Sequence, residues 1–407
     1  MNSSYYRSAK ERVATALRGN QCTFEELCKM CQGLYPTLVK EIIDELRIYS
    51  TLVPNYTTNH NLLPYDVQDE SFCELRESIT GSIQNNPVLS SWYFSWNTCA
   101  KISQLDIWKK KKLLFLGTPR LFEFFVSHRY GDSKTLVDLD STVINALSAK
   151  YKSYSENIFF LAKDIGTMDL DNCASLIPCS YDYVFFDPPW YPDEYSTWLK
   201  IALKYVKSTG SIVFSLFPSL LRPTAVEERK QILDKCREVA DKIYLCSGQL
   251  EYDVPTFENN ELKLEGINLR SNWKTSDMII VSGMQEQKNY NFNYQSSGYA
   301  AWKEFWWLDA RWFLDTTRSF STDRQLISAP LETLFLKNPS RRNIQLKEVN
   351  LLSSKGHGLR ISDPIRFLNL LEQLHVTTNS SNLYNSICSL DIDEASKQIL
   401  IELAEDF

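Results

Sequence analysis

Apolar segments alternate with helical stretches along the central half of this chain, and this order is what most constrains its fold. Five segments have the composition of buried strands, and they span residues 113–116, 135–137, 157–161, 181–186 and 210–215. Strands that alternate with helices form a parallel sheet with helices packed against it. Two more apolar segments, 242–245 and 278–281, are expected to close the sheet as an antiparallel pair. We therefore predict an α/β domain over residues 86–284.

Residues 1–85 have a different pattern, with three helical stretches in succession. The second stretch begins with a capping box at Thr23, in which Glu26 is the third helical residue. A short extended segment is expected at 49–54, and this order predicts a winged-helix-like domain. The third helix carries acidic residues beside its basic ones, so docking or dimerisation is favoured over recognition of DNA.

Residues 285–407 carry no motif that names a chemistry. We expect this region to be mainly helical, with the aromatic side chains between Trp302 and Phe313 gathered on one helix. Asp363-Pro364 is a suitable N-cap and first-turn pair for a further helix. The region is a candidate surface for a protein partner, as is the N-terminal domain.

Charge and composition exclude several classes of protein. The 407 residues carry a formal net charge of −6, whereas a protein that binds duplex nucleic acid unaided usually presents a basic surface. Nucleic acid would therefore meet a local patch or arrive with a partner. No signal peptide or apolar run long enough to span a bilayer is found, so we expect a cytoplasmic protein with no membrane contact. Cys28 and Cys31 have no second pair at zinc spacing, so no metal is expected.

Polar residues stand at the carboxyl ends of the predicted strands, where open α/β sheets bind their ligands. Gly117 and Thr118 follow the first strand, Asp138 and Asp140 the second, and Asp164 the third. A glycine there lets the backbone approach a nucleoside-like cofactor, and an acidic residue can accept hydrogen bonds from ribose hydroxyls. Asp164 is placed to meet the exocyclic amine of adenine. A single glycine does not make a dinucleotide-binding turn, which favours S-adenosylmethionine over a dinucleotide.

The fourth strand ends in Asp187-Pro188-Pro189-Trp190. Two prolines in succession fix two φ angles and make a stiff corner, which holds a carboxylate, carbonyl oxygens and an aromatic plane toward a ligand. Such a corner suits a planar or amine-bearing substrate. A strand end that merely turns is the alternative for the Pro-Pro pair alone, and the ordered polar strand ends argue against it.

With these segments in order, the chain resembles the class I amino methyltransferases, and within them the N6-adenine methyltransferase-like family. The likeness rests on the aromatic segment 91–98, the turn 116–121, the segment 136–140 and the Asp-Pro-Pro-aromatic corner, in which Trp190 stands where the family usually has Phe or Tyr. The resemblance implies a Rossmann-like domain that binds S-adenosylmethionine through Gly117, Thr118, Asp138 and Asp164, with Asn97 and Thr98 as a less secure addition. It implies a substrate site made of Asp187, Pro188, Pro189 and Trp190.

The resemblance leaves the substrate open. Adenine in RNA or DNA is slightly favoured over a protein lysine, because Trp190 would stack on a flat base. Asp187 and the Pro188 carbonyl would accept hydrogen bonds from either amine, so the motif alone does not decide between them. Transfer of an aminopropyl group to a polyamine is a second alternative, since such enzymes share the fold and an Asp-Pro-Pro corner. A non-catalytic scaffold that uses the flanking regions to assemble a complex is a third.

Overall fold

The computed structural model describes twelve stretches of the chain. They are residues 3–17, 22–46, 78–89, 91–151, 153–154, 157–167, 180–269, 272–285, 302–320, 325–329, 347–375 and 380–405.

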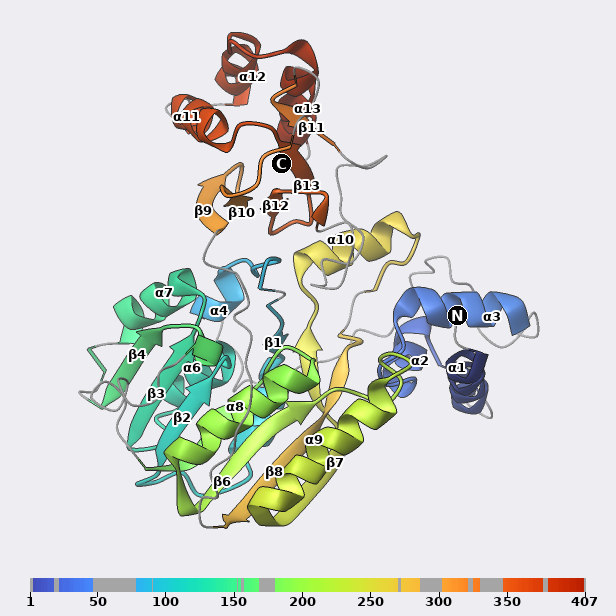
Figure 1. The fold of residues 1–407 in the computed structure, drawn as a ribbon, viewed down its shortest axis with the longest axis vertical. Coiled ribbons are helices and arrows are strands. Elements are labelled where there is room, and N and C mark those ends of the chain that lie inside the picture. Colours follow the sequence, from blue (N-terminus) through green and yellow to red (C-terminus); the bar gives the residue numbers. More distant parts are fainter. Residues whose placement is uncertain are drawn as a thin grey trace. The chain divides into compact units, whose positions relative to one another are not determined.

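The central region forms one eight-stranded sheet (Figure 1). Across the sheet the strands are β1 (Tyr93–Phe94), β7 (Ala240–Asp253), β8 (Thr275–Met284), β6 (Val206–Leu216), β5 (Tyr181–Phe186), β2 (Lys112–Leu116), β3 (Ser133–Asp138) and β4 (Ile158–Ala162). Neighbouring strands from β6 to β4 pair in parallel, whereas β8 is antiparallel to both β6 and β7. The predicted sheet and its antiparallel closing pair are confirmed. Its strand order is that of the class I methyltransferase fold.

Both faces of this sheet are apolar and both are covered by helices. Leu114 and Leu116 of β2 pack into one core, with α8 (Pro192–Tyr205) and α9 (Ala225–Val239). Leu113 and Phe115 point the other way and join the core under α5 (Trp96–Ser103), α6 (Pro119–Ser127) and α7 (Ser141–Tyr151). Successive residues of a strand face opposite sides, so a strand buried on both sides is an uninterrupted apolar run. This is why the sequence pattern located the central strands.

The N-terminal helices pack with this sheet in one compact unit. They are α1 (Ser3–Leu17), α2 (Phe24–Met30) and α3 (Pro36–Leu46). The predicted capping box opens α2, where the Thr23 side chain accepts from the Glu26 amide at 3.2 Å. Tyr5 donates to the Leu220 carbonyl at 3.0 Å. The extended segment expected at 49–54 lies outside the described residues, so the winged-helix detail stays a prediction.

A second compact unit combines residues 84–91, 255–268 and 297–407. Its five strands lie in the order β11 (Ile327–Ser328), β13 (Gly358–Ile361), β12 (Leu351–Ser353), β10 (Ala310–Asp315) and β9 (Trp302–Trp307). Its helices are α10 (Thr256–Leu264), α11 (Pro364–His375), α12 (Ser380–Cys388) and α13 (Glu394–Glu405). The predicted start of α11 is confirmed, because the Arg366 amide donates to Asp363 at 3.0 Å.

The expected aromatic helix in this region was wrong, and the mainly helical description is incomplete. Residues 302–315 form the antiparallel hairpin of β9 and β10, in which Trp307 pairs with Ala310. Leu308 and Asp309 both have a φ of 49°, the left-handed geometry of a tight two-residue turn. Aromatic side chains favour strands, but the Asn-Gly or Asp-Gly signal of such a turn is missing here.

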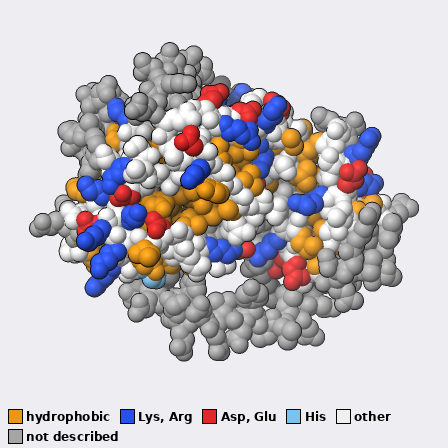
Figure 2. Space-filling model, turned by 90° about the horizontal axis from the view of Figure 1, so that it is seen from below, with side chains coloured by type: hydrophobic (Ala, Val, Ile, Leu, Met, Phe, Trp, Pro, Cys, Tyr) orange, Lys and Arg blue, Asp and Glu red, His pale blue; other side chains and the backbone are white. Residues whose placement is uncertain are grey.

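The distribution of charge on the surface and the hydropathy of the helices both bear on which partners the chain can have. On the face shown in Figure 2, Lys and Arg side chains lie among Asp and Glu side chains and around a central apolar area. In the helices that the structure describes, none is both long and apolar enough to cross a bilayer.

Candidate active site

The turn after β2 brings backbone close to the carboxyl edge of the sheet. Gly117 has a φ of +61°, and its amide donates to the Val137 carbonyl of the neighbouring strand at 2.9 Å. A Cβ at this position would lie 2.6 Å from Cη2 of Trp198, so glycine is required both by conformation and by space. The next hydroxyl, Thr118 Oγ1, is buried and has no hydrogen-bond partner among the described residues. The turn therefore offers a ligand a close backbone approach and an unused polar atom.

The acidic strand ends lie at the same edge. Asp138 ends β3, and its Oδ1 accepts from the Asp140 amide at 2.8 Å. Asp164 follows β4, and its Oδ1 accepts from the Gly166 amide at 2.8 Å. Asp138 is level with Ala162 in the β3–β4 ladder, so the two carboxylates belong to adjacent strand ends. Local backbone donors fix the orientation of each side chain.

Asp187 stands beside the Gly117 turn, because Leu116 and Phe186 pair in the β2–β5 ladder. Its Oδ1 accepts a hydrogen bond from Tyr252 Oη at 2.9 Å and a close one from Ser215 Oγ. Ser215 comes from β6 and Tyr252 from β7, so three strands fix one carboxyl group. A carboxylate oriented by two hydroxyl donors can accept hydrogen bonds from a substrate amine at a defined place.

Burial raises the pKa of Asp187 to about 6. The hydrogen bonds from Ser215 and Tyr252 and the positive charge of Lys274 act against burial and lower it. The same surroundings hold the pKa of the Tyr252 hydroxyl well above its ordinary value, through burial first and then the Asp187 charge. Tyr252 therefore stays a hydrogen-bond donor, while Asp187 gains its charge close to neutral pH. A shifted pKa of this kind, in a group at a ligand edge, is typical of an active site.

Trp190 completes the corner. Its carbonyl accepts from Arg222 Nη2 at 2.7 Å, and the ring meets the ring of Tyr252 edge-on at 5.7 Å. The ammonium of Lys274 lies over the same indole, 4.4 Å from the ring centre. The aromatic face that was predicted to flank a substrate is thus already in contact with a cation.

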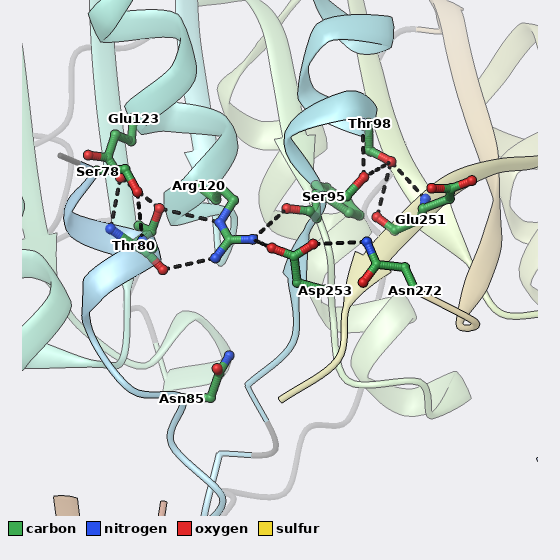
Figure 3. Close-up of polar contacts among 12 residues, drawn as sticks. Ser78, Thr80, Asn85, Ser95, Thr98, Arg120, Glu123, Glu251, Asp253 and Asn272 are labelled. Atoms are coloured by element: carbon green, nitrogen blue, oxygen red, sulfur yellow. Dashed lines mark hydrogen bonds and ion pairs between the residues drawn. The ribbon is translucent and has the colours of Figure 1, made fainter. Parts of the chain in front are cut away.

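Arg120, at the start of α6, ties the segments around the turn together (Figure 3). It donates to the Thr80 carbonyl at 2.9 Å and to the Phe94 carbonyl at 3.2 Å, and it forms a close ion pair with Asp253. Only 6% of Arg120 is exposed. The Glu123 carboxylate, on the same helix, accepts from the Thr80 amide at 2.9 Å. One buried cation therefore connects α4 (Ile79–Ser82), β1 and the end of β7.

A small hollow lies between the glycine turn and the corner. Its lining residues are Trp92, Tyr93, Phe94, Gly117, Thr118, Pro119, Arg120, Leu121 and Asp187. The close backbone approach at Gly117 fits a nucleoside-type cofactor at this place. The Thr118 hydroxyl, which has no hydrogen-bond partner among the described residues, fits it as well. Among the described residues, no three His, Cys, Asp or Glu side chains are grouped as metal ligands would be.

Asn97 and Thr98 do not line this hollow. Asn97 is exposed in the first turn of α5, and the buried Thr98 hydroxyl accepts from the Glu251 amide at 2.7 Å. Their role in cofactor binding stays a prediction. Gly117, Thr118 and Asp187 line the hollow, whereas Asp138 and Asp164 stand at neighbouring strand ends and are not among its lining residues.

Sequence reasoning missed the side chains that surround Asp187 from the far end of the sheet. Ser215 closes a predicted strand, and only its register with β5 shows that it meets Asp187. Tyr252 and Lys274 border the long connection between the last two strands, where no periodic pattern is available. Trp92 belongs to the aromatic segment that carried the resemblance, which could have indicated a role at the site.

The strand order defines the fold class of this protein, that of the class I methyltransferases. Residues 85–275 match the model of the family described as "Probable N6-adenine methyltransferase". Family and fold together make it an S-adenosylmethionine-dependent methyltransferase.

Solved structures of a polyamine synthase share the fold of this chain. The branched-chain polyamine synthase from Thermus thermophilus is 12% identical, with a TM-score of 0.52 and coverage of 70% of this chain and 90% of that chain. Its C9 mutein is 13% identical, with a TM-score of 0.53 and the same coverage. An rRNA methylase from Streptococcus thermophilus is 9% identical and has a TM-score of 0.30, with coverage of 46% and 93%. No curated protein sequence matches the chain.

Proposed function

We propose that this chain methylates an amino nitrogen held against Asp187. The observation that carries the proposal is the Asp187 carboxylate, which is oriented by Ser215 and Tyr252 at the edge of the hollow beside Gly117. The family supports the reaction class, and the stiff Pro188-Pro189 corner supports the geometry.

The residues of the chain divide between two tasks. Gly117, Thr118, Asp138 and Asp164 hold S-adenosylmethionine, which supplies an electrophilic methyl group on a sulfonium. Asp187 and the carbonyl of Pro188 accept hydrogen bonds from the acceptor amine, and this keeps its lone pair aimed along the line of transfer.

Pro189 and Trp190 complete the acceptor side of the site. Pro189 keeps the corner rigid, and Trp190 flanks the acceptor. Positioning of two reactants in this way supplies a large part of the acceleration in many enzymes.

The acceptor amine belongs to one of two chemical kinds, an aromatic amine or an alkyl amine. N6 of adenine, in RNA or DNA, is favoured by the description of the family. An alkyl amine, such as a lysine side chain or a polyamine, is favoured by the ammonium of Lys274 over the Trp190 ring. The Thermus thermophilus synthase was solved with N4-aminopropylspermidine and 5'-methylthioadenosine, so aminopropyl transfer to a polyamine is tested beside methyl transfer.

The function is tested by incubating the purified chain with methyl-labelled S-adenosylmethionine and separate fractions of RNA, DNA, protein and polyamines. We expect label in one fraction, on an amino nitrogen. Product mass distinguishes an added methyl group from an aminopropyl group, which is tested with the decarboxylated cofactor. If no fraction gains label or mass while the chain binds the cofactor, the proposed activity is wrong and a scaffold role is favoured.

The pH dependence of the reaction should follow the ionisation of Asp187. The ionised form of Asp187 is the stronger hydrogen-bond acceptor, so kcat/KM should fall as pH decreases through about 6. Above this pH the rate should level off for adenine N6, whereas it should keep rising for an alkyl amine, which has a pKa of about 10.4 and must lose a proton before it reacts. In a Lys274→Met variant the acid limb should move to higher pH, because the lost cation lowers the pKa of Asp187 in the wild type. Initial rates between pH 5 and 8 measure both, in saturating cofactor. A flat profile over this range would show that the rate does not depend on the ionisation of Asp187.

A further inference from the structure

The ammonium of Lys274 lies in a cage of three aromatic rings, those of Trp92, Trp190 and Tyr252. Nζ is 3.5 Å from the centre of the Trp92 ring, 4.4 Å from that of Trp190 and 5.6 Å from that of Tyr252. All three distances are within the range of about 6 Å over which a ring face attracts a cation. The three rings therefore surround the Lys274 ammonium as an aromatic cage.

The cage is built from elements that do not depend on its occupant. β1 pairs with β7, with Phe94 opposite Tyr252, and this places Trp92 beside the Tyr252 ring at 6.5 Å, edge-on. Trp190 is set by the Pro-Pro corner and meets Tyr252 edge-on at 5.7 Å. The occupant, in contrast, is the end of a flexible four-carbon side chain. The backbone of Lys274 is fixed, because its carbonyl accepts from the Tyr252 amide at 3.0 Å.

The cage adjoins the acceptor end of the proposed active site. Tyr252 is both a wall of the cage and a donor to Asp187 at 2.9 Å, and the charge of Lys274 acts on the same carboxylate. Trp190 is both a wall of the cage and part of the corner. An ammonium in the cage therefore lies beside the carboxylate to which we assign the acceptor amine.

We propose that the aromatic cage binds an alkylammonium group of the acceptor, and that Lys274 is its internal occupant and specificity-determining residue. The nitrogen that accepts the methyl group must first lose a proton to solvent, because an ammonium has no lone pair. An incoming alkylammonium replaces the Lys274 ammonium like for like, over the same rings and near the same carboxylate. A neutral base would instead displace the Lys274 ammonium from the three rings and from Asp187. It would replace neither the cation–π attraction nor the attraction to the carboxylate. The inference rests on the proposed function for the identity of the acceptor side.

An internal occupant weakens the binding of a competing ligand. The apparent affinity is the intrinsic affinity multiplied by the fraction of time for which the site is vacant. In a Lys274→Met variant the site loses its competitor, so spermidine should bind about tenfold tighter than to the wild type. We would titrate the full-length chain, without cofactor, with spermidine, with Nα-acetyl-lysine methylamide and with adenosine, and follow indole fluorescence and heat. Lys242→Met, at an exposed lysine on β7, is the matched control and should bind like the wild type.

The outcomes separate the sources of the ammonium. A gain for spermidine alone supports a free polyamine, a gain for the lysine amide alone supports a protein lysine, and a gain for both supports the alkylammonium class. Adding Trp190→Ala to Lys274→Met should remove the gain, with thermal melts to confirm folding. Unchanged amine affinity in Lys274→Met, or a gain for adenosine only, would overturn the inference. Because no turnover is measured, failure here leaves methyl transfer untouched, and failure of methyl transfer leaves the binding result standing.

Discussion

An Asp187→Ala variant is expected to lose methyl transfer by about 10²–10³-fold in kcat, the usual cost of removing one oriented polar group from a transition state. The reason is that no other acceptor of the corner is held by two hydroxyl donors, Ser215 and Tyr252. The affinity for S-adenosylmethionine should change little, because the Gly117 turn and Asp138 stay in place. Single-turnover transfer of labelled methyl, with calorimetry of cofactor binding, measures the two quantities separately.

Asp193→Ala is the matched control for this variant. Asp193 is the same type of residue in the first turn of α8, a few residues after the corner, but it is exposed. Its loss should leave the rate within about twofold, since surface substitutions are nearly neutral. An Asp187→Ala enzyme that keeps wild-type kcat would remove Asp187 from the mechanism.

Arg120→Met should be the most destabilising substitution near the site. The guanidinium is buried and binds the Thr80 and Phe94 carbonyls and the Asp253 carboxylate at the same time. Removal of one partner of a buried ion pair costs about 3–5 kcal/mol, and about 2–3 kcal/mol is expected here because the Asp253 side chain is 41% exposed. Urea unfolding followed by circular dichroism measures the loss in the free energy of unfolding.

Arg237→Met provides the comparison for this second variant. Arg237 pairs with Asp234 on the surface of α9, where the two side chains are 63% and 48% exposed, and such pairs contribute less than about 1 kcal/mol. Arg120→Lys should recover only part of the stability, because an ammonium cannot reach three separated acceptors as a planar guanidinium does. Equal urea midpoints for Arg120→Met and Arg237→Met would show that Arg120 does not hold these segments together.

Local patterns predicted the elements that depend on neighbouring residues. The buried runs at 113–116 and 181–186 are β2 and β5, and the capping box at Thr23 opens α2. The prediction of a helix from Trp302 to Phe313 was wrong. The segment is a hairpin that turns at Leu308-Asp309 without the residues that normally mark such a turn.

The chemistry-bearing residues divide in the same way. Asp138 ends a strand, and Gly117 and Asp187 each directly follow one, so strand order alone predicts that they share one edge. The contacts that shape Asp187 come from β6 and β7, and a register shift in β7 between Cys246 and Leu250 precedes Tyr252. No local pattern contains the register between strands that lie far apart in the chain.

The order of buried strands and the Asp187-Pro188-Pro189-Trp190 corner were enough to name the fold, the cofactor and the reaction class. They are properties of short stretches, in which burial and proline geometry act on adjacent residues. Only the folded structure decides the near-neutral pKa of Asp187 and the cage around Lys274. Both depend on residues that lie far apart in the chain, such as Trp92, Trp190 and Tyr252. Desolvation and cation–π attraction depend on distances in space, and these exist only once the strands are paired.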